Sequence, residues 1–276
     1  MNWSDRTKQV IDYIEDHLDS IIDYTEIDRI AICSSGLFGR AFALIVGFPL
    51  SEYIRLRRLS EAGQALLSGN DRIIDVALRY GYESPDAFTT AFKKWHGIAP
   101  SKARLLAHQM KYYPKLSLNF TIQGGIEMVY RMMDRGPFTV VGKSIRTSQS
   151  NNECPHFWDQ CFKDKTVDEC CKIGQGPLLG VCYDGAKDGS FRYMIGVEAK
   201  NNPEGWEKLE VKAARWAIFE VPGINPQAIQ EAFKYIFTTF LGTGKYRHDD
   251  APELEVYYSE QKTGCRTEIW VPVLEK

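Results

Sequence analysis

The chain has 276 residues, of which 44% are hydrophobic, 12% aromatic and 25% charged. This composition is typical of a globular protein with room for two domains, and it excludes a disordered, fibrous or small disulfide-stapled protein. No run approaches the roughly 20 apolar residues that cross a bilayer. The N-terminus also lacks the pattern of a signal or transit peptide. We therefore expect a cytoplasmic protein without membrane contact.

The cysteines and histidines do not predict a metal site. The seven cysteines are odd in number and include no CxxC pair, and the five histidines are dispersed. Cys154 and His156 form the one local pair. Reduced thiols are the expectation, with no metal and no cofactor.

The net charge of −2 hides an uneven distribution of charged residues. Residues 1–28 contain two basic and eight acidic residues, a net charge of −6, whereas residues 29–104 contain eleven basic and six acidic residues, a net charge of +5. A basic stretch is suited to contact with phosphates, although a solvated basic surface is the alternative interpretation.

The first part of the chain shows helical periodicity. Apolar residues within 10–22 recur at helical spacing and predict an amphipathic helix. Asp23 and Glu26 have the spacing of a capping box, so a second helix should begin there. Ser34 can cap a third helix, which Gly47 should end.

The third helix has two distinct faces. Phe38 and Phe42 stand four residues apart on the apolar face. The opposite face carries Ser35, Gly36, Gly39 and Arg40. Small and basic side chains on an exposed face are suited to a helix that enters a DNA groove.

A long connecting helix and a second pair of helices follow. Ser51 should cap the connecting helix, and Asn70 or Asp71 should open the next one. Ser84 and Pro85 mark the start of a second groove-reading helix. Its outward residues are Thr89, Thr90, Lys93 and Lys94. Two such units on a rigid connecting helix can reach successive major grooves of DNA.

Residues 4–106 resemble the DNA-binding domain of AraC/XylS-type transcription regulators. The second unit carries the matching positions Ile74-Asp75-Val76-Ala77, Gly81-Tyr82-Glu83-Ser84, Phe88, Phe92, Gly97 and Pro100. The first unit and the connecting helix match at Ser34, Arg40, Phe42, Gly47, Tyr53, Ile54, Arg58, Ala62 and Leu66-Leu67. Gly36 and Gly39 depart from the family, which often carries larger base-contacting side chains there.

These residues give a set of candidate DNA contacts. Arg40 is the expected base reader, while Ser35, Lys93 and Lys94 are expected to contact phosphate or sugar. Asp86 is expected mainly to stabilise the start of its helix, with cytosine readout as the alternative. The full set is Ser35, Gly36, Gly39, Arg40, Asp86, Thr89, Thr90, Lys93 and Lys94. Two glycines in a reading helix predict modest affinity.

The second part of the chain repeats one pattern. Residues 1–108 form the expected all-α double helix-turn-helix domain, 109–123 a linker, and 124–276 an α+β domain. The repeat is a ββαββ unit. Its first copy has strands 126–132 and 138–146, helix 155–172, and strands 178–183 and 191–198. The second has strands 208–212 and 215–221, helix 226–241, and strands 253–259 and 266–273. Two such halves should leave a groove at their junction.

Residues 124–275 resemble the GyrI-like effector-binding domain. The resemblance is carried by Phe138–Gly142, Trp158 with Phe162, Gly180–Asp184, Tyr193–Val197, Glu255–Tyr257 and Glu268–Val273. It implies a pocket for amphipathic, often cationic or drug-like molecules, and in some relatives hydrolysis of electrophilic compounds.

A carboxylate beside aromatic rings is suited to binding an organic cation. Strand alternation places Glu255 and Tyr257 on one face, and Glu268 and Trp270 also share a face. Glu255 is the preferred counter-ion, with Glu268 as the alternative. The ligand-binding candidates are Glu255, Glu268, Trp158, Phe162, Tyr183, Tyr193, Trp216, Tyr257 and Trp270.

These observations predict a transcription regulator, an activator by resemblance, that senses a hydrophobic or cationic molecule. Its expected partners are promoter DNA, the small-molecule effector and RNA polymerase. Two alternatives remain for the C-terminal domain: a hydrolase of electrophilic compounds, or a protein-binding module. We find no spacing that places a nucleophile next to a base, and this favours a protein that is not an enzyme.

Overall fold

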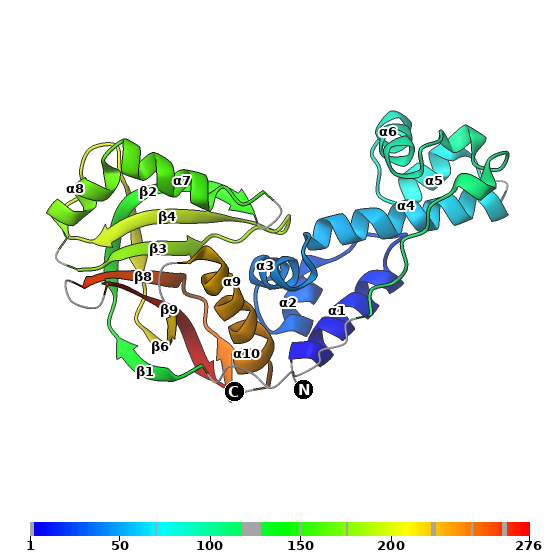
Figure 1. The fold of residues 1–276 in the computed structure, drawn as a ribbon. Coiled ribbons are helices and arrows are strands. Elements are labelled where there is room, and N and C mark those ends of the chain that lie inside the picture. Colours follow the sequence, from blue (N-terminus) through cyan, green and yellow to red (C-terminus); the bar gives the residue numbers. More distant parts are fainter. Residues whose placement is uncertain are drawn as a thin grey trace.

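A computed structural model describes residues 3–69, 71–117, 128–148, 151–174, 176–221, 225–243, 245–260 and 264–276. A helical region is followed by one antiparallel sheet with helices packed on it (Figure 1). This confirms the predicted fold class. The helices of the first region are α1 (Trp3–Asp16), α2 (Tyr24–Ala31), α3 (Ser35–Val46), α4 (Leu50–Ser68), α5 (Ile73–Arg79) and α6 (Pro85–His96), followed by the short 3-10 turns η1 (Pro100–Lys102) and η2 (Ala107–Gln109).

Three expected N-caps are present in the helical region. The Asp23 side chain accepts a hydrogen bond from the backbone N–H of Thr25 at the start of α2. The Ser34 side chain accepts a hydrogen bond from the backbone N–H of Leu37, and Ser84 accepts one from Ala87. Each bond satisfies a backbone donor that the helix itself leaves unpaired. Local chemistry therefore fixes where α3 and α6, the two helices predicted to enter DNA grooves, begin.

Two other expected caps are wrong. Pro49, not Ser51, precedes α4, because buried Leu50 belongs to the first turn of that helix. Arg72 precedes α5 in place of Asp71, and its guanidinium pairs with Asp75. Asn70 lies outside the described residues.

The first helix is shorter than its apolar pattern predicts. It ends at Asp16, although Leu18 and Ile22 beyond it are still buried. The guanidinium of Arg58 on α4 donates to the carbonyl oxygens of Leu18 and Ser20, at 3.0 and 2.7 Å. These bonds hold residues 17–22 in a non-helical path that inserts Leu18 and Ile22 into the core and leaves Ile21 exposed.

The second region alternates strands with helices. Its elements are β1 (Tyr130–Arg135), β2 (Phe138–Ser148), α7 (Cys154–Lys163), α8 (Thr166–Ile173), β3 (Leu178–Tyr183), β4 (Ser190–Glu198), β5 (Glu207–Val211), β6 (Ala214–Val221), α9 (Pro226–Tyr235), a π-helical turn η3 (Ile236–Phe240), α10 (Leu241–Thr243), β7 (Tyr246–His248), β8 (Glu253–Glu260) and β9 (Gly264–Glu275). The expected first helix is split into α7 and α8 at Lys165, which has a positive φ of 64°.

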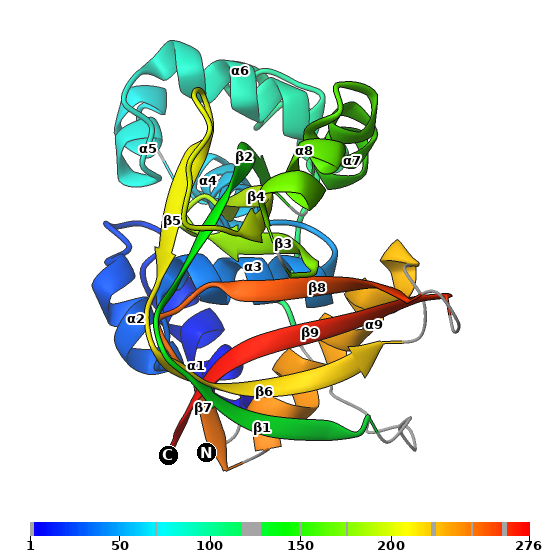
Figure 2. The same ribbon diagram turned by 90° about the vertical axis from the view of Figure 1, so that its left-hand side faces the viewer.

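The sheet joins two similar halves into one surface. Its order is β1-β6-β9-β8-β3-β4-β2-β5, with β7 paired to β9 at the side. The two halves meet where β3 pairs with β8, and every strand pair among the described residues is antiparallel. The expected ββαββ duplication is therefore present, but the first strand of each half crosses over: β1 pairs with β6 and β5 with β2. The sheet curves strongly along its length (Figure 2).

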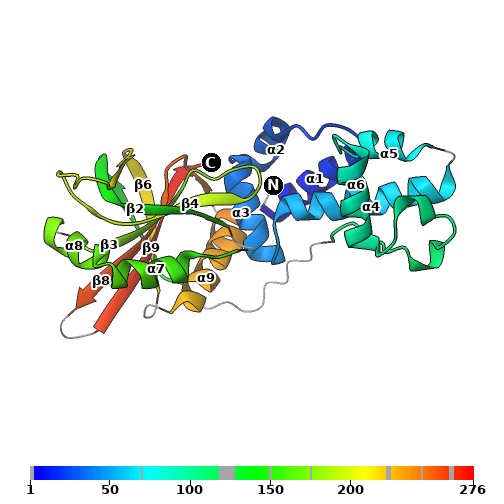
Figure 3. The same ribbon diagram turned by 90° about the horizontal axis from the view of Figure 1, so that it is seen from above.

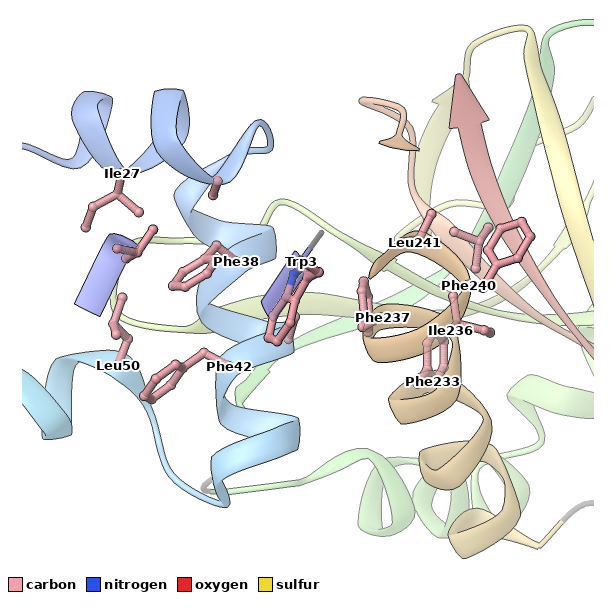
Figure 4. Close-up of a cluster of buried hydrophobic side chains, with 14 of the residues drawn as sticks. Trp3, Ile27, Phe38, Phe42, Leu50, Phe233, Ile236, Phe237, Phe240 and Leu241 are labelled. Atoms are coloured by element: carbon pink, nitrogen blue, oxygen red, sulfur yellow. The ribbon is translucent and has the colours of Figure 1, made fainter. Parts of the chain in front are cut away.

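The first helix-turn-helix unit shares its core with the sheet domain. Trp3, Phe38 and Phe42 belong to the same buried cluster as Phe233 and Phe237 near the end of α9 (Figure 4). The second unit has a separate core around Phe88 and Phe92. In Figure 3, α1 to α3 lie between the sheet domain and the second unit, which α4 carries outward. The first unit is thus packed on the sheet domain, whereas the second unit does not share that core.

The segment after η2 follows the first unit. The backbone N–H of Tyr113 donates to Ser60 Oγ at 2.9 Å, and that of Leu116 donates to the Tyr53 hydroxyl at 3.1 Å. Residues 118–123 of the expected linker and residues 126–127 of the expected first strand lie outside the described residues.

Neither a single membrane-spanning helix nor a metal-binding cluster is found among the described residues. No single helix there is long and apolar enough to cross a membrane, and the bent pair α2 and α3, which passes that test when taken together, contributes side chains to the buried core. Within the same ranges, no group of three or more His, Cys, Asp or Glu side chains is arranged to hold a metal ion.

Candidate effector cavity and the buried reading helix

A cavity of about 860 Å³ lies between α7 and α9, over the middle of the sheet. This volume falls in the range of small-molecule sites. Five of the predicted ligand-binding residues line it: Glu255, Tyr257, Tyr193, Trp158 and Phe162. The groove therefore lies where the two halves of the sheet meet, as the duplication predicts.

Glu255 is the buried acid of the cavity, with 9% of its surface exposed. Its Oε2 accepts hydrogen bonds from the hydroxyls of Tyr193 and Tyr257, at 2.5 and 2.8 Å. Burial raises the pKa of this carboxyl, and the two tyrosine hydrogen bonds oppose the rise. An ionised Glu255 therefore gains from a positive charge in the cavity.

Gly180 makes room for this arrangement. It faces Glu255 across the β3–β8 pair. A Cβ at this position would lie 2.4 Å from the Tyr193 hydroxyl oxygen and 2.7 Å from Glu255 Oε2. A larger residue would displace both groups, so the glycine is required by the close approach of the two side chains.

Aromatic rings form one wall of the cavity. The Trp158 indole N–H donates to the Tyr193 hydroxyl at 2.9 Å, and its ring lies edge to face with Tyr257, at 5.1 Å between centroids. Phe162 follows Trp158 along α7 and is 60% exposed. The wall thus presents π faces close to Glu255, an arrangement that attracts organic cations.

Cysteine thiols add apolar surface to the same cavity. Cys154 and Cys182 both line it. Burial raises the pKa of Cys154 to about 12, and it also raises that of Cys182 well above its usual value. Both thiols are protonated at neutral pH and are therefore poor nucleophiles.

Four predicted ligand-binding residues lie outside this cavity, which corrects their expected place. Glu268 is fully buried elsewhere, where it accepts from Arg131 at 2.9 Å and from the Trp270 indole N–H at 2.9 Å. Glu268 on β9 pairs with Val256 on β8. Val256 follows Glu255 in its strand, so these two side chains point to opposite faces of the sheet. Glu268, as the partner of Val256, therefore lies on the face opposite to Glu255. Trp216 and Trp270 belong to the apolar cluster on that face. The Tyr183 hydroxyl instead accepts from Arg192 at 3.2 Å.

Helix α3 contributes to the cavity, which the sequence did not predict. Arg40 and Leu44 line it together with Phe191 and Phe233. Arg40 is only 7% exposed. Its Nη2 forms an ion pair with Glu253 Oε1 at 2.7 Å, and its guanidinium lies over the rings of Phe191 and Phe233, at 5.1 and 5.9 Å.

Glu253 anchors this contact on β8, two residues before Glu255. Although burial raises its pKa, Arg40 and then His248 outweigh that effect and lower it to about 2. His248 Nε2 lies 3.1 Å from the same carboxylate oxygen. The carboxylate is therefore ionised at neutral pH, and it balances the buried Arg40 charge.

The remaining predicted contacts of α3 are also covered, contrary to expectation. Ser35, Gly36 and Gly39 are buried in this arrangement. A Cβ on Gly36 would lie 2.3 Å from the carbonyl oxygen of Gly185 in the β3–β4 loop. Gly36 and Gly39, the two positions that depart from the AraC/XylS-type pattern, thus lie where the helix backbone approaches the sheet domain. At Gly36 this approach leaves no room for a side chain.

The second reading helix is exposed instead. On α6, Asp86, Thr90, Lys93 and Lys94 are exposed and Thr89 is half-buried. Phe88 and Phe92 on its other face are fully buried. The predicted polar face of α6 is therefore accessible, in contrast to that of α3.

Comparison with known families agrees with this architecture. The family described as the GyrI-like small molecule binding domain matches residues 128–274, more than half of the chain. The chain belongs to the GyrI-like family. A helix-turn-helix domain matches residues 29–105, which include both reading helices of this GyrI-like protein.

Curated relatives match little more than a third of the chain and include transcription regulators. The activator AarP of Providencia stuartii is 37% identical over 97 residues, which cover 35% of this chain and 72% of AarP. The multiple antibiotic resistance protein MarA of Escherichia coli is 33% identical over 96 residues, covering 35% of this chain and 76% of MarA. The uncharacterised regulator YbfP of Bacillus subtilis is 40% identical over 104 residues, which are 38% of this chain and only 35% of YbfP. The chain therefore joins an AraC-type DNA-binding domain to a GyrI-like domain.

Solved structures are similar to each part separately. The structure of SAV2435 bound to tetraphenylphosphonium covers 53% of this chain and 94% of its own, with 24% identity and a TM-score of 0.46. A transcriptional regulator of Chromobacterium violaceum with an AraC-type DNA-binding domain covers 38% of this chain and 92% of its own, with 21% identity and a TM-score of 0.35.

Proposed function

We propose that this protein is a ligand-responsive transcription regulator, and an activator, whose cavity takes a hydrophobic organic cation and whose helix-turn-helix units bind promoter DNA. The observation that supports the ligand class is Glu255, a buried carboxylate surrounded by Tyr193, Tyr257 and Trp158. Aromatic faces attract a cation, and a desolvated carboxylate strengthens that attraction, because the local dielectric is low.

The DNA-binding part of the proposal is supported by the two capped helices and by the exposed basic residues of α6. Lys93 and Lys94 lie on the open face of that helix. Positive side chains there would contact phosphates and set the register on the duplex, while neighbouring side chains read base edges. RNA polymerase is a further proposed partner, as expected for an activator.

The cation site is tested by titrating the full chain with three molecules of similar shape. Tetraphenylphosphonium is the cation, triphenylphosphine oxide the neutral compound and tetraphenylborate the anion. Binding is measured by calorimetry and by quenching of tryptophan fluorescence, since Trp158 lines the cavity. We expect cation-selective binding that Glu255→Gln abolishes.

Glu268→Gln is the matched control, because Glu268 is also a buried glutamate but lies on the other face of the sheet. It should leave cation binding unchanged. Equal binding of all three molecules, or binding that survives Glu255→Gln, would contradict the proposed ligand class.

We expect the protein to be a sensor rather than an enzyme. Prolonged incubation with an electrophilic ester, followed by mass spectrometry, should show no turnover above the rate in buffer. Turnover that Glu255→Gln abolishes would instead favour the hydrolase alternative.

A further inference from the structure

The reading face of α3 is occupied by the protein's own sheet domain. Ser35, Gly36, Gly39 and Arg40, which are on the face predicted to meet DNA, are all buried there. A reading helix must place this face in the major groove. The same face cannot contact DNA and the sheet domain at once, so the two contacts exclude each other.

The contact is closely fitted. The α3 backbone at Gly36 reaches the loop at Gly185 so closely that a Cβ would lie 2.3 Å from the Gly185 carbonyl oxygen. Beside it, the Ser51 hydroxyl at the start of α4 donates to the Asp188 carbonyl oxygen at 3.4 Å. The shared apolar core adds Trp3 and Phe38 on one side and Phe237 on the other. The helix is thus seated on a complementary surface.

Arg40 occupies the part of the cavity that is chemically suited to a cation. It forms an ion pair with Glu253 and lies over the rings of Phe191 and Phe233. On the neighbouring part of the cavity wall, Glu255, Tyr257 and Trp158 offer a ligand the same kind of environment, a carboxylate beside aromatic rings. Arg40 is therefore a cation supplied by the DNA-binding domain.

We propose that docking of α3 through Arg40 keeps the first helix-turn-helix unit off DNA, and that a cationic effector in the cavity releases it. This rests on the proposed cation-binding function and adds a mechanism for its regulation. A ligand shifts an equilibrium only through different affinity for the two states. A cation beside the buried Arg40 is repelled, whereas the cavity without Arg40 offers the free carboxylate of Glu253 as well as Glu255.

The docked protein still has one accessible reading helix. Because α6 belongs to a unit with its own core, it can contact DNA while α3 is docked. Release of α3 adds a second, linked contact on the next major groove, and linked contacts raise affinity strongly. The effector would therefore change both the affinity and the length of the DNA site.

The test uses two full-length variants that open the contact from the sheet side. Glu253→Gln removes the charge that balances Arg40, and Gly185→Val inserts a side chain against Gly36. Neither residue belongs to the helix-turn-helix units. DNA selected from a random library with the full chain in the presence of tetraphenylphosphonium serves as the probe.

Without ligand, both variants should bind this DNA at least about 10-fold more tightly than the unsubstituted chain, since the binding-competent fraction rises. Hydroxyl-radical footprints should extend from one major groove to two successive grooves. Tetraphenylphosphonium should produce the same changes in the unsubstituted chain and little further change in the variants. Glu268→Gln, the matched buried glutamate, should behave like the unsubstituted chain.

Two failures are distinguishable in this design. If both variants bind DNA as the unsubstituted chain does, with one-groove footprints, docking of α3 does not limit DNA binding and the inference is wrong. If the variants bind more tightly but calorimetry shows no tetraphenylphosphonium binding to the unsubstituted chain, the docking holds and the proposed ligand class is wrong. Hydrogen exchange in residues 35–46 gives an independent readout, since release should speed it.

Discussion

Arg40 on α3 and Glu253 on β8 form a buried ion pair of 2.7 Å that links the DNA-binding region to the effector cavity. Both side chains are almost inaccessible, with 8% and 3% of their surface exposed. The residue expected to read bases thus has an intramolecular partner. Its charge is therefore balanced within the protein by Glu253.

Removing the Arg40 charge should destabilise the folded chain. Arg40→Met keeps an extended side chain but leaves the Glu253 carboxylate without its main partner, and breaking a buried pair costs roughly 3–5 kcal/mol. Urea unfolding followed by tryptophan fluorescence measures the change. Arg29→Met is the control, because the Arg29 side chain is 72% exposed in its pair with Glu26 and exposed ion pairs contribute little to stability. Similar losses for both variants would contradict a stabilising role for the Arg40 pair.

Cation binding should depend on pH through Glu255. Burial raises the pKa of this carboxyl in the folded protein, so below that raised value the empty site carries a proton. A cation favours the ionised form, and binding therefore releases the proton. Affinity should rise with pH until Glu255 is ionised in the free protein and then level off. Calorimetry of tetraphenylphosphonium binding in two buffers with different ionisation enthalpies measures the released proton, and an unchanged binding enthalpy would argue against this assignment.

Gly180→Ala should damage the cavity from within the sheet. Its Cβ would lie 2.4 Å from the Tyr193 hydroxyl oxygen, so the hydrogen bond from Tyr193 to Glu255 must shift. Overpacking of this kind costs about 1–3 kcal/mol of stability. We expect both a lower unfolding free energy and weaker tetraphenylphosphonium binding.

The control for this substitution is Gly136→Ala, in the turn between β1 and β2, where a Cβ would have no neighbour within 4 Å. It should change neither quantity. A fully active, fully stable Gly180→Ala protein would show that the sheet can adjust at this point without moving Tyr193.

Lys94 on α6 should contribute to DNA binding through phosphate rather than through bases. Lys94→Ala should weaken binding to all sequences alike and reduce the slope of log affinity against log salt by about 0.9. Fluorescence anisotropy over a salt series measures both effects. Lys212→Ala is the control, since this lysine is exposed in the sheet domain. A sequence-dependent loss with an unchanged salt slope would assign Lys94 to base readout instead.

Local sequence patterns were sufficient for several parts of the structure. Ser34 and Ser84 cap their helices as predicted, because a cap depends on bonds between residues three apart in the chain. The alternation that puts Glu255 and Tyr257 on one face of β8 is equally local. The order of strands and helices in the sheet domain was also predictable, because each element depends on residues that are close together in the chain.

Relations between distant segments needed the tertiary structure. Alternation within β9 predicts that Glu268 and Trp270 share one face of the sheet. Only the pairing of Glu268 with Val256 decides which face this is. The pairing of β1 with β6 and of β5 with β2 also depends on strands far apart in the chain. Register is set by the packing of the whole sheet rather than by either strand alone.

The α3 helix shows this division most clearly. By itself the sequence determined that Phe38 and Phe42 share one face and that Gly36 and Arg40 lie on the opposite one, with Ser35 and Gly39 between, because helical spacing is a property of neighbouring residues. Only the tertiary structure decided what the second face meets. A small, basic helix face is chemically suited both to a phosphate backbone and to a buried carboxylate. Glu253, more than two hundred residues further along the chain, is brought to this face by the folding of the sheet domain.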